Sequence, residues 1–121
     1  MSKRILIIED QPDNRQIMHD ALSASGYESL EAVTGEHGLE LAGSEIPDLI
    51  LMDIQLPGMD GYEVTRRIKG NAALNHIPII AVTSYALSGD DQKAFAAGCD
   101  GYLTKPVSPK RLLAKIKEYL P

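Results

Sequence analysis

The chain has 121 residues, of which 44% are hydrophobic and 24% charged, and its formal net charge is −5. This length predicts a single domain over residues 1–121 that can bury a substantial core. A negative net charge argues against nucleic acid as a direct partner, because such binding depends on neutralising phosphates. The lone cysteine, Cys99, predicts a reducing compartment, and no apolar run is long enough to cross a membrane, so we expect a cytoplasmic protein.

Short apolar runs alternate with stretches of helical periodicity along the chain. In chain order we predict a strand at Arg4–Ile8, a helix at Pro12–Ser25, a strand at Tyr27–Val33, a helix from Thr34 to Ala42, a strand at Asp48–Met52, a helix at Met59–Gly70, a strand at Ile77–Val82, a helix from about Ala86 to Ala97, a strand at Gly101–Thr104 and a last helix that begins at Ser108 or Pro109. In the first helix, the apolar face is predicted to contain Ile17, Ala21 and Leu22.

Five strands that alternate with five helices predict an α/β fold, in which a parallel sheet is covered by helices on both faces. The near-continuous apolar runs of the first, third and fourth strands suit central positions, and the more polar second strand suits an edge. We therefore predict the doubly wound, flavodoxin-like strand order 2-1-3-4-5. Right-handed crossovers then place the first and fifth helices on one face and the other three helices on the other face.

Polar residues follow the strands at their carboxyl ends, which meet at one edge of a parallel sheet. These residues are Glu9 and Asp10, Asp53, Thr83 and Ser84, and Lys105 and Pro106. Three carboxylates in one crevice repel one another unless a cation joins them, and Mg²⁺ combines one or two carboxylates with waters and a phosphate. Because a lysine and a hydroxyl lie beside them and no Gly-rich nucleotide loop is present, the set predicts a site for a phosphoryl group.

Four sequence features together match one known family. They are Glu9-Asp10, the segment LMDIQLPGMDGYE around Asp53, Thr83 after IPIIAV, and Tyr102 with Lys105-Pro106 in GYLTKP. On these features, residues 4–120 resemble the receiver domain of two-component response regulators, in its single-domain, stand-alone form without an output domain. The resemblance implies a signalling protein rather than an enzyme, although such a domain catalyses its own phosphorylation and dephosphorylation.

The resemblance implies a role for each residue of the acidic crevice. Asp53 would be the nucleophile that takes phosphate from a phosphohistidine and becomes an aspartyl phosphate. Mg²⁺ would be bound by Asp10, Asp53 and the backbone carbonyl of Gln55. Glu9 would act on the metal ion mainly through bound water.

The resemblance also implies a switch. Lys105 would pair with the phosphoryl group, and the peptide bond between Lys105 and Pro106 would be cis. Thr83 would move to donate a hydrogen bond to a phosphoryl oxygen, and Tyr102 would rotate inward into the space that Thr83 leaves. The face formed by the fourth helix, the fifth strand and the fifth helix would then change and carry the signal.

The implied partners are a histidine kinase or histidine phosphotransfer protein upstream and a target protein downstream, with the domain acting as a monomer. We expect Asn14, Arg15 and Met18 of the first helix to lie near the crevice and to take part in recognition of the upstream partner. Whether the signal leaves by contact with a target or by onward transfer of the phosphate stays open.

Three residues bear on access to the site and on the lifetime of the phosphate. Ser84 stands where the family commonly has a smaller alanine, which narrows the approach. Gln55 and Tyr85 lie two positions beyond Asp53 and Thr83, where the resemblance implies an influence on phosphate loss. Tyr85 is bulky enough to restrict water, so we expect slow autodephosphorylation.

Two other functions fit a similar fold. A metal-dependent phosphohydrolase commonly uses an Asp-x-Asp pair, but Gln55 stands where the second acid would protonate the leaving group. A degenerate receiver that acts as a constitutive binding module would lack the acceptor, a metal-binding acid or the lysine, whereas Asp53, Asp10 and Lys105 are all present. The resemblance therefore favours the phosphoacceptor over both alternatives.

Overall fold

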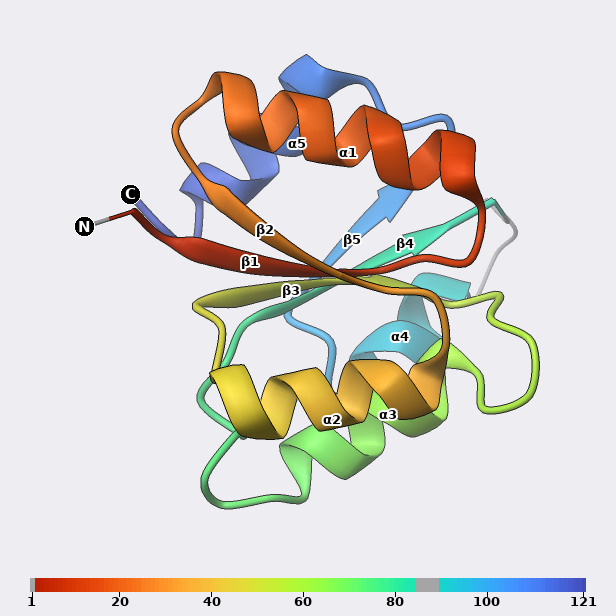
Figure 1. Ribbon diagram of the computed structural model, residues 1–121. Helices are drawn as coiled ribbons and strands as arrows, with labels where there is room; N and C mark the ends of the chain where they lie inside the picture. Colours follow the sequence, from red (N-terminus) through yellow and green to blue (C-terminus); the bar gives the residue numbers. More distant parts are fainter. Residues whose placement is uncertain (1, 85–89) are drawn as a thin grey trace.

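The computed structural model describes residues 2–84 and 90–121. Within these residues, strands and helices alternate (Figure 1). In chain order they are β1 Arg4–Ile8, α1 Pro12–Ala24, β2 Glu28–Ala32, α2 Gly35–Glu45, β3 Leu49–Asp53, α3 Gly61–Lys69, β4 Ile79–Thr83, α4 Asp90–Ala97, β5 Gly101–Thr104 and α5 Pro109–Lys117. The predicted alternation is confirmed, with boundaries that differ from the predictions by a few residues.

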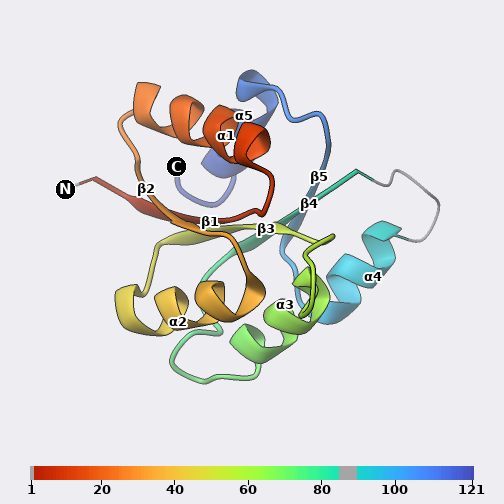
Figure 2. The same cartoon turned by 45° about the vertical axis from the view of Figure 1, so that its right-hand side comes forward.

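The strands form one parallel sheet in the order β2-β1-β3-β4-β5, so the predicted strand order is confirmed. Helices α1 and α5 cover one face, and α2, α3 and α4 cover the other, as the right-handed crossovers predicted (Figures 1 and 2). The polar strand β2 lies at an edge of the sheet. The order puts β1 beside β3, which is the point where the chain reverses its direction of winding.

The core has two layers, one on each side of the sheet. Successive side chains of a strand point to opposite faces, so the apolar runs of the central strands fill both layers. The layer under α1 and α5 contains Ile5, Ile7, Leu49 and Leu51, and the layer over α2, α3 and α4 contains Leu6, Ile8, Ile50 and Met52. Burial on both faces explains why these strands show no alternation of apolar and polar residues.

The predicted face of α1 is wrong by one residue. Ile17 is 46% exposed, whereas Met18, Ala21 and Leu22 are buried in the layer beneath the helix. The buried stripe therefore runs i, i+3, i+4 from Met18. It shares Ala21 and Leu22 with the predicted face, so Ile17 is the residue of that face that was misplaced. Two apolar residues in adjacent positions leave this choice open until the helix packs.

Side-chain caps fix where three helices begin. Thr34, Asp60 and Ser108 each accept a hydrogen bond from the backbone N–H three residues on, over 3.0–3.2 Å. Because Asp60 is the cap, α3 begins at Gly61 and not at the predicted Met59. The predicted start of the fourth helix near Ala86 lies outside the described residues.

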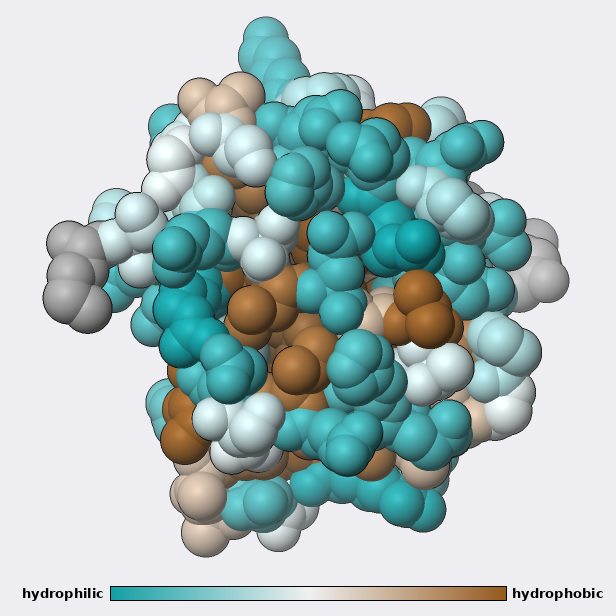
Figure 3. All heavy atoms as spheres, viewed as in Figure 1, coloured by the Kyte–Doolittle hydropathy of each residue, from teal (hydrophilic) through white to brown (hydrophobic). Residues whose placement is uncertain are grey.

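The surface over β2 and α2 is largely hydrophilic, with apolar side chains gathered near its centre (Figure 3). Leu30 of β2 and Leu39 of α2 are partly buried and pack against the core. Among the described residues, the large apolar side chains that are most exposed are Ile17, Val33, Ile46 and Phe95. None of the described helices is long and apolar enough to cross a membrane.

The loop after β3 is closed by two glycines. Gly58 has φ +73°, a backbone conformation that other L residues rarely adopt. Gly61 donates its N–H to the carbonyl oxygen of Ile54 over 3.1 Å. A Cβ atom on Gly61 would lie 2.4 Å from the carbonyl oxygen of Asp53, so the start of α3 can approach the end of β3 only with glycine there.

We expect Gly61→Ala to lower the free energy of unfolding by about 1–3 kcal/mol, because the added methyl group forces the backbone of Asp53 and Ile54 to shift. Gly43→Ala is the matched control: Gly43 lies in α2 with no atom near the position of a new Cβ, so this change should stabilise the protein by up to about 1 kcal/mol. Urea unfolding followed by circular dichroism measures both, and equal stability of the two variants would contradict the close approach.

Candidate functional site

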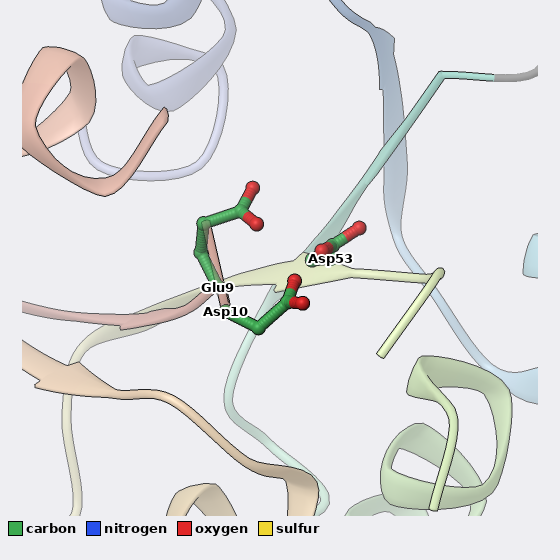
Figure 4. A group of neighbouring side chains, drawn as sticks. All are labelled: Glu9, Asp10 and Asp53. Atoms are coloured by element: carbon green, nitrogen blue, oxygen red, sulfur yellow. The ribbon is translucent and has the colours of Figure 1, made fainter. Parts of the chain in front are cut away.

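Three carboxylates meet where β1 and β3 end. Ile8 pairs with Met52 across the two strands, so the next residue of each chain segment, Glu9 and Asp53, lie side by side. Figure 4 shows Glu9, Asp10 and Asp53 turned toward one space. One carboxylate oxygen from each lies within 4.8 Å of the others. The acids that follow β1 and β3 in the sequence therefore lie together at one edge of the sheet.

The acids differ in their contact with solvent. Glu9 is fully buried and Asp53 is 2% exposed, whereas Asp10 is half-buried. The open pocket beside them has a volume of about 230 Å³. Its lining residues are Asp10, Gln11, Asn14, Asp53, Gln55, Ser84 and Lys105. A phosphate-sized group with coordinated water fits a space of this size.

Lys105 is the cation among these acids. Its Nζ lies 2.8 Å from Oε1 of Glu9, as an ion pair rather than a well-directed hydrogen bond, and 3.3 Å from Oδ1 of Asp53. The backbone N–H of Lys105 donates to the carbonyl oxygen of Thr83 over 2.7 Å, which holds the end of β5 against β4. The bond between Lys105 and Pro106 is cis.

The pKa values of this group are linked. Burial raises the pKa of Asp53 from its ordinary value of 3.8 to about 7, and the neighbouring Glu9 carboxyl adds to this rise. The Lys105 ammonium and the N–H of Gln55 oppose the rise but do not cancel it. Burial lowers the pKa of Lys105, but Glu9 and Asp53 outweigh that effect and raise it, so Lys105 stays charged.

The donor set suits a hard divalent cation. Three carboxylates face one ammonium, so the crevice has more potential negative charge than Lys105 can balance. Oxygen ligands in an open, wet pocket are what Mg²⁺ takes in proteins, and a second positive charge would relieve the repulsion that raises the pKa of Asp53.

The side chain of Gln55 makes a contact that the sequence analysis missed. Its Nε2 donates to Oγ1 of Thr83, and its Oε1 accepts from the backbone N–H of Ser84 over 3.0 Å. The backbone N–H of Gln55 donates to Oδ1 of Asp53 over 3.1 Å. Gln55 was expected to act through its backbone carbonyl and on phosphate loss, and a glutamine in a loop carries no local signal that identifies a partner 28 residues away.

The other predicted residues lie as follows. Thr83 is 1% exposed at the end of β4, and Ser84 is exposed at the pocket rim. Tyr102 of β5 is partly buried against the core layer over α2, α3 and α4. Tyr85 lies outside the described residues.

The three residues of α1 that were expected near the crevice do lie there. Asn14 lines the acidic pocket, and Met18, although only 3% exposed, lines a smaller pocket beside Glu9 and Lys105. Arg15 donates to the carbonyl oxygens of Glu9 and Asp10 over 3.0 and 3.4 Å. It also pairs with Glu31 at 3.3 Å, so its guanidinium links the backbone of Glu9 and Asp10 to β2.

The fold and the site define a class of protein: a phosphoacceptor domain with an aspartate at the end of a central strand. The chain matches the family model of the response regulator receiver domain over residues 5–117. The chain therefore belongs to the response regulator receiver domain family, as the motifs predicted.

Individual relatives agree with this assignment. The chain is 45% identical over 120 residues to the polar-differentiation response regulator DivK of Brucella ovis, which covers 99% of this chain and 98% of that protein. It is similar to a CheY-like receiver domain protein of Methanospirillum hungatei, with 37% identity, a TM-score of 0.91 and coverage of 99% and 94%.

A third similar structure is the receiver domain of a sensor histidine kinase from Pseudomonas aeruginosa, with 33% identity, a TM-score of 0.92 and coverage of 99% and 98%. That domain has a magnesium ion coordinated in its active site cleft. Receiver domains bind Mg²⁺ in an acidic active site, and this chain has such an acidic group in Glu9, Asp10 and Asp53. The family defines a signalling phosphoacceptor that works between histidine-phosphorylated partners and downstream targets.

The raised pKa of Asp53 predicts how stability depends on pH without metal. Below pH 4, Asp53 is protonated in both the folded and the unfolded state, so its ionisation does not change the free energy of unfolding. Between about pH 4 and pH 7 the unfolded state has lost this proton while the folded state keeps it, so the free energy of unfolding falls as the pH rises through this window and levels off above about pH 7. We expect Asp53→Asn to stabilise the metal-free protein by about 1–4 kcal/mol above pH 7 and to have little effect near pH 4.

Urea unfolding in the presence of a chelator, repeated at several pH values, measures this difference. Asp20→Asn is the control, because Asp20 is an exposed carboxylate of α1 that does not line the pocket. Added Mg²⁺ should narrow the gap between wild type and Asp53→Asn, since it binds the folded wild type. A gap of the same size at every pH would contradict a raised pKa.

Proposed function

We propose that Asp53 is the residue that accepts the phosphoryl group, from a phosphohistidine of a kinase or phosphotransfer protein. The observation that carries the proposal is the position of Asp53 at the end of a buried strand, in contact with both Lys105 and the N–H of Gln55. Both contacts fall on Oδ1, so neither occupies Oδ2. Oxygen–phosphorus bond formation at Asp53 would accompany cleavage of the nitrogen–phosphorus bond of the donor.

The charges of the site support this reaction. Phosphoryl transfer depends on positioning and on neutralising the charge of the equatorial oxygens. Lys105 has an ammonium within reach of the Asp53 carboxylate and can move with the phosphoryl group. We assign the metal ligands to Asp10, Asp53 and the Gln55 carbonyl, with Glu9 acting through water. Mg²⁺ bound there would supply a second positive charge to the transferred group.

We also infer that the domain resets itself. An aspartyl phosphate is an acyl phosphate, so attack by water at phosphorus restores the Asp53 carboxylate and releases phosphate. Thr83 and Tyr102 are assigned the switch, and the surface of α4, β5 and α5 the output. The bulk of Tyr85, two residues beyond Thr83 in the sequence, remains the reason to expect slow loss of the phosphate.

We infer that the chain acts as a monomeric, single-domain regulator of the cytoplasm. The match to DivK of Brucella ovis covers 98% of that protein, which supports the single-domain part of this inference. The free, buried thiol of Cys99 suits a reducing compartment. A single-domain regulator of this kind would pass its signal to a separate target or onward as phosphate. A phosphohydrolase is disfavoured, because Gln55 cannot protonate a leaving group.

The first test is intact mass after incubation with acetyl phosphate and Mg²⁺. Wild type should gain one phosphoryl group, whereas Asp53→Asn and a sample with chelator should gain none. Asp48→Asn is a matched control, because Asp48 precedes the same strand at its opposite end and should leave the adduct intact. An adduct that persists in Asp53→Asn would place the acceptor elsewhere and overturn the assignment.

The upstream partner is predicted to dock beside the acidic pocket on α1 and the segment after β5. A small, mainly apolar pocket there is lined by Asn14, Ile17, Met18, Pro106 and Val107, next to Glu9 and Lys105. Ile17→Ser should lower the rate of transfer from a cognate phosphohistidine protein at least fivefold relative to the rate with acetyl phosphate. Ile46→Ser is the control, since Ile46 is 49% exposed and follows α2, just before β3 begins, at the end of the strands away from the acidic pocket. If Ile17→Ser and Ile46→Ser give the same ratio of the transfer rate from the phosphohistidine protein to the rate with acetyl phosphate, this docking surface is ruled out.

A further inference from the structure

We propose that the side chain of Gln55 is a latch that holds the end of β4 in the resting arrangement, and that the latch must open before Thr83 can reach a phosphoryl group. This inference rests on the proposed function of Asp53 and adds a positioning residue to it. The latch joins the loop after β3 to the residues Thr83 and Ser84, across 28 or more positions of sequence.

Both ends of the Gln55 amide are engaged. The Nε2 group donates to Oγ1 of Thr83, and Oε1 accepts from the backbone N–H of Ser84. An amide held by both its donor and its acceptor fixes the side chain of one residue and the backbone of the next. Movement of Thr83 toward the pocket therefore breaks or rearranges two hydrogen bonds and not one.

Thr83 is buried outside the acidic pocket, so it has to move to reach a phosphoryl group there. Thr83 is 1% exposed and does not line the acidic pocket, whereas Gln55 and Ser84 do. A phosphoryl group on Asp53 would occupy that pocket. Thr83 accepts from Gln55 without using its own O–H for that bond, but its buried hydroxyl has to move into that pocket to reach the phosphoryl group. This movement draws Oγ1 away from Nε2 of Gln55, so the latch opposes switching before phosphorylation.

Gln55 is also hydrogen-bonded directly to Asp53. The backbone N–H of Gln55 donates to Oδ1 of Asp53, two residues before it. Conversion of the carboxylate into an acyl phosphate removes its charge from the two carboxyl oxygens and weakens them as acceptors. The backbone anchor of Gln55 and its side-chain latch thus lie on one residue, which couples the chemistry at Asp53 to release of Thr83.

Removal of the latch should favour the switched arrangement without phosphate. A net hydrogen bond contributes a factor of about five in an equilibrium constant, so loss of the two contacts should shift the balance by about fivefold or more. Gln55→Met is the suitable variant, because it keeps the length of the side chain and the backbone N–H and carbonyl while it removes the amide. Gln11→Met is the matched control, since Gln11 lines the same pocket but its side chain contacts Asp10 and neither Thr83 nor Ser84.

The experiment is amide hydrogen exchange and chemical-shift mapping by NMR on the full chain. Wild type and both variants are measured without phosphate donor or metal, and wild type with acetyl phosphate and Mg²⁺ gives the phosphorylated reference positions. We expect the Ser84 amide to exchange at least fivefold faster in Gln55→Met than in wild type or Gln11→Met. The amide of Ile54, which donates to the carbonyl oxygen of Val82 over 3.1 Å, should keep its wild-type rate and so report that the strands are intact. The Thr83 and Ser84 resonances of Gln55→Met should also move toward their positions in phosphorylated wild type.

Unchanged Ser84 exchange in Gln55→Met would overturn the latch, as would faster exchange without movement of the resonances toward the phosphorylated positions. Equal acceleration of the Ile54 amide would assign Gln55 a general structural role and would also overturn it. The exchange measurement needs no phosphate. Failure of wild type to form an aspartyl phosphate would therefore contradict the proposed function and remain distinguishable from failure of the latch.

Discussion

The properties of the site depend on the crowding of negatively charged side chains where β1 and β3 end. Glu9 and Asp53 are both buried there, and the single ammonium of Lys105 contacts both carboxylates. Burial of charge is costly unless a partner is present, and one cation for three acids leaves the group under-compensated. Burial and the neighbouring Glu9 carboxyl together raise the pKa of Asp53, and the group of acids suits the site to Mg²⁺.

Such crowding persists only because the frame around it is rigid. The central strands are buried on both faces, so Asp53 cannot withdraw toward solvent without disturbing both core layers. The close approach of Gly61 to the backbone of Asp53 fixes the loop that follows. Arg15 braces the carbonyl oxygens of Glu9 and Asp10 from α1. The cost of the acidic site is thus offset by packing distributed over the whole sheet.

A switch requires two arrangements of similar free energy, with contacts that differ between them. The resting arrangement holds Thr83 through Gln55, and the phosphorylated arrangement would hold it through the phosphoryl group. The hydroxyl accepts a neutral hydrogen bond from Gln55 in the first arrangement and would donate a stronger, charge-assisted one to a phosphoryl oxygen in the second, so one covalent event can reverse the balance. A much stronger resting contact would lock the domain, and a weaker one would let it switch without phosphate.

The sequence by itself determined the fold class, the strand order and the clustering of Glu9, Asp10, Asp53 and Lys105. Apolar runs, glycines and prolines are local signals, and parallel strands necessarily bring their carboxyl ends to one edge. The tertiary structure alone decided that Met18 and not Ile17 faces the core, that Gln55 holds Thr83, and that the pKa of Asp53 lies near 7. These features depend on how side chains from distant segments pack and exclude water, and no pattern of neighbouring residues contains that information.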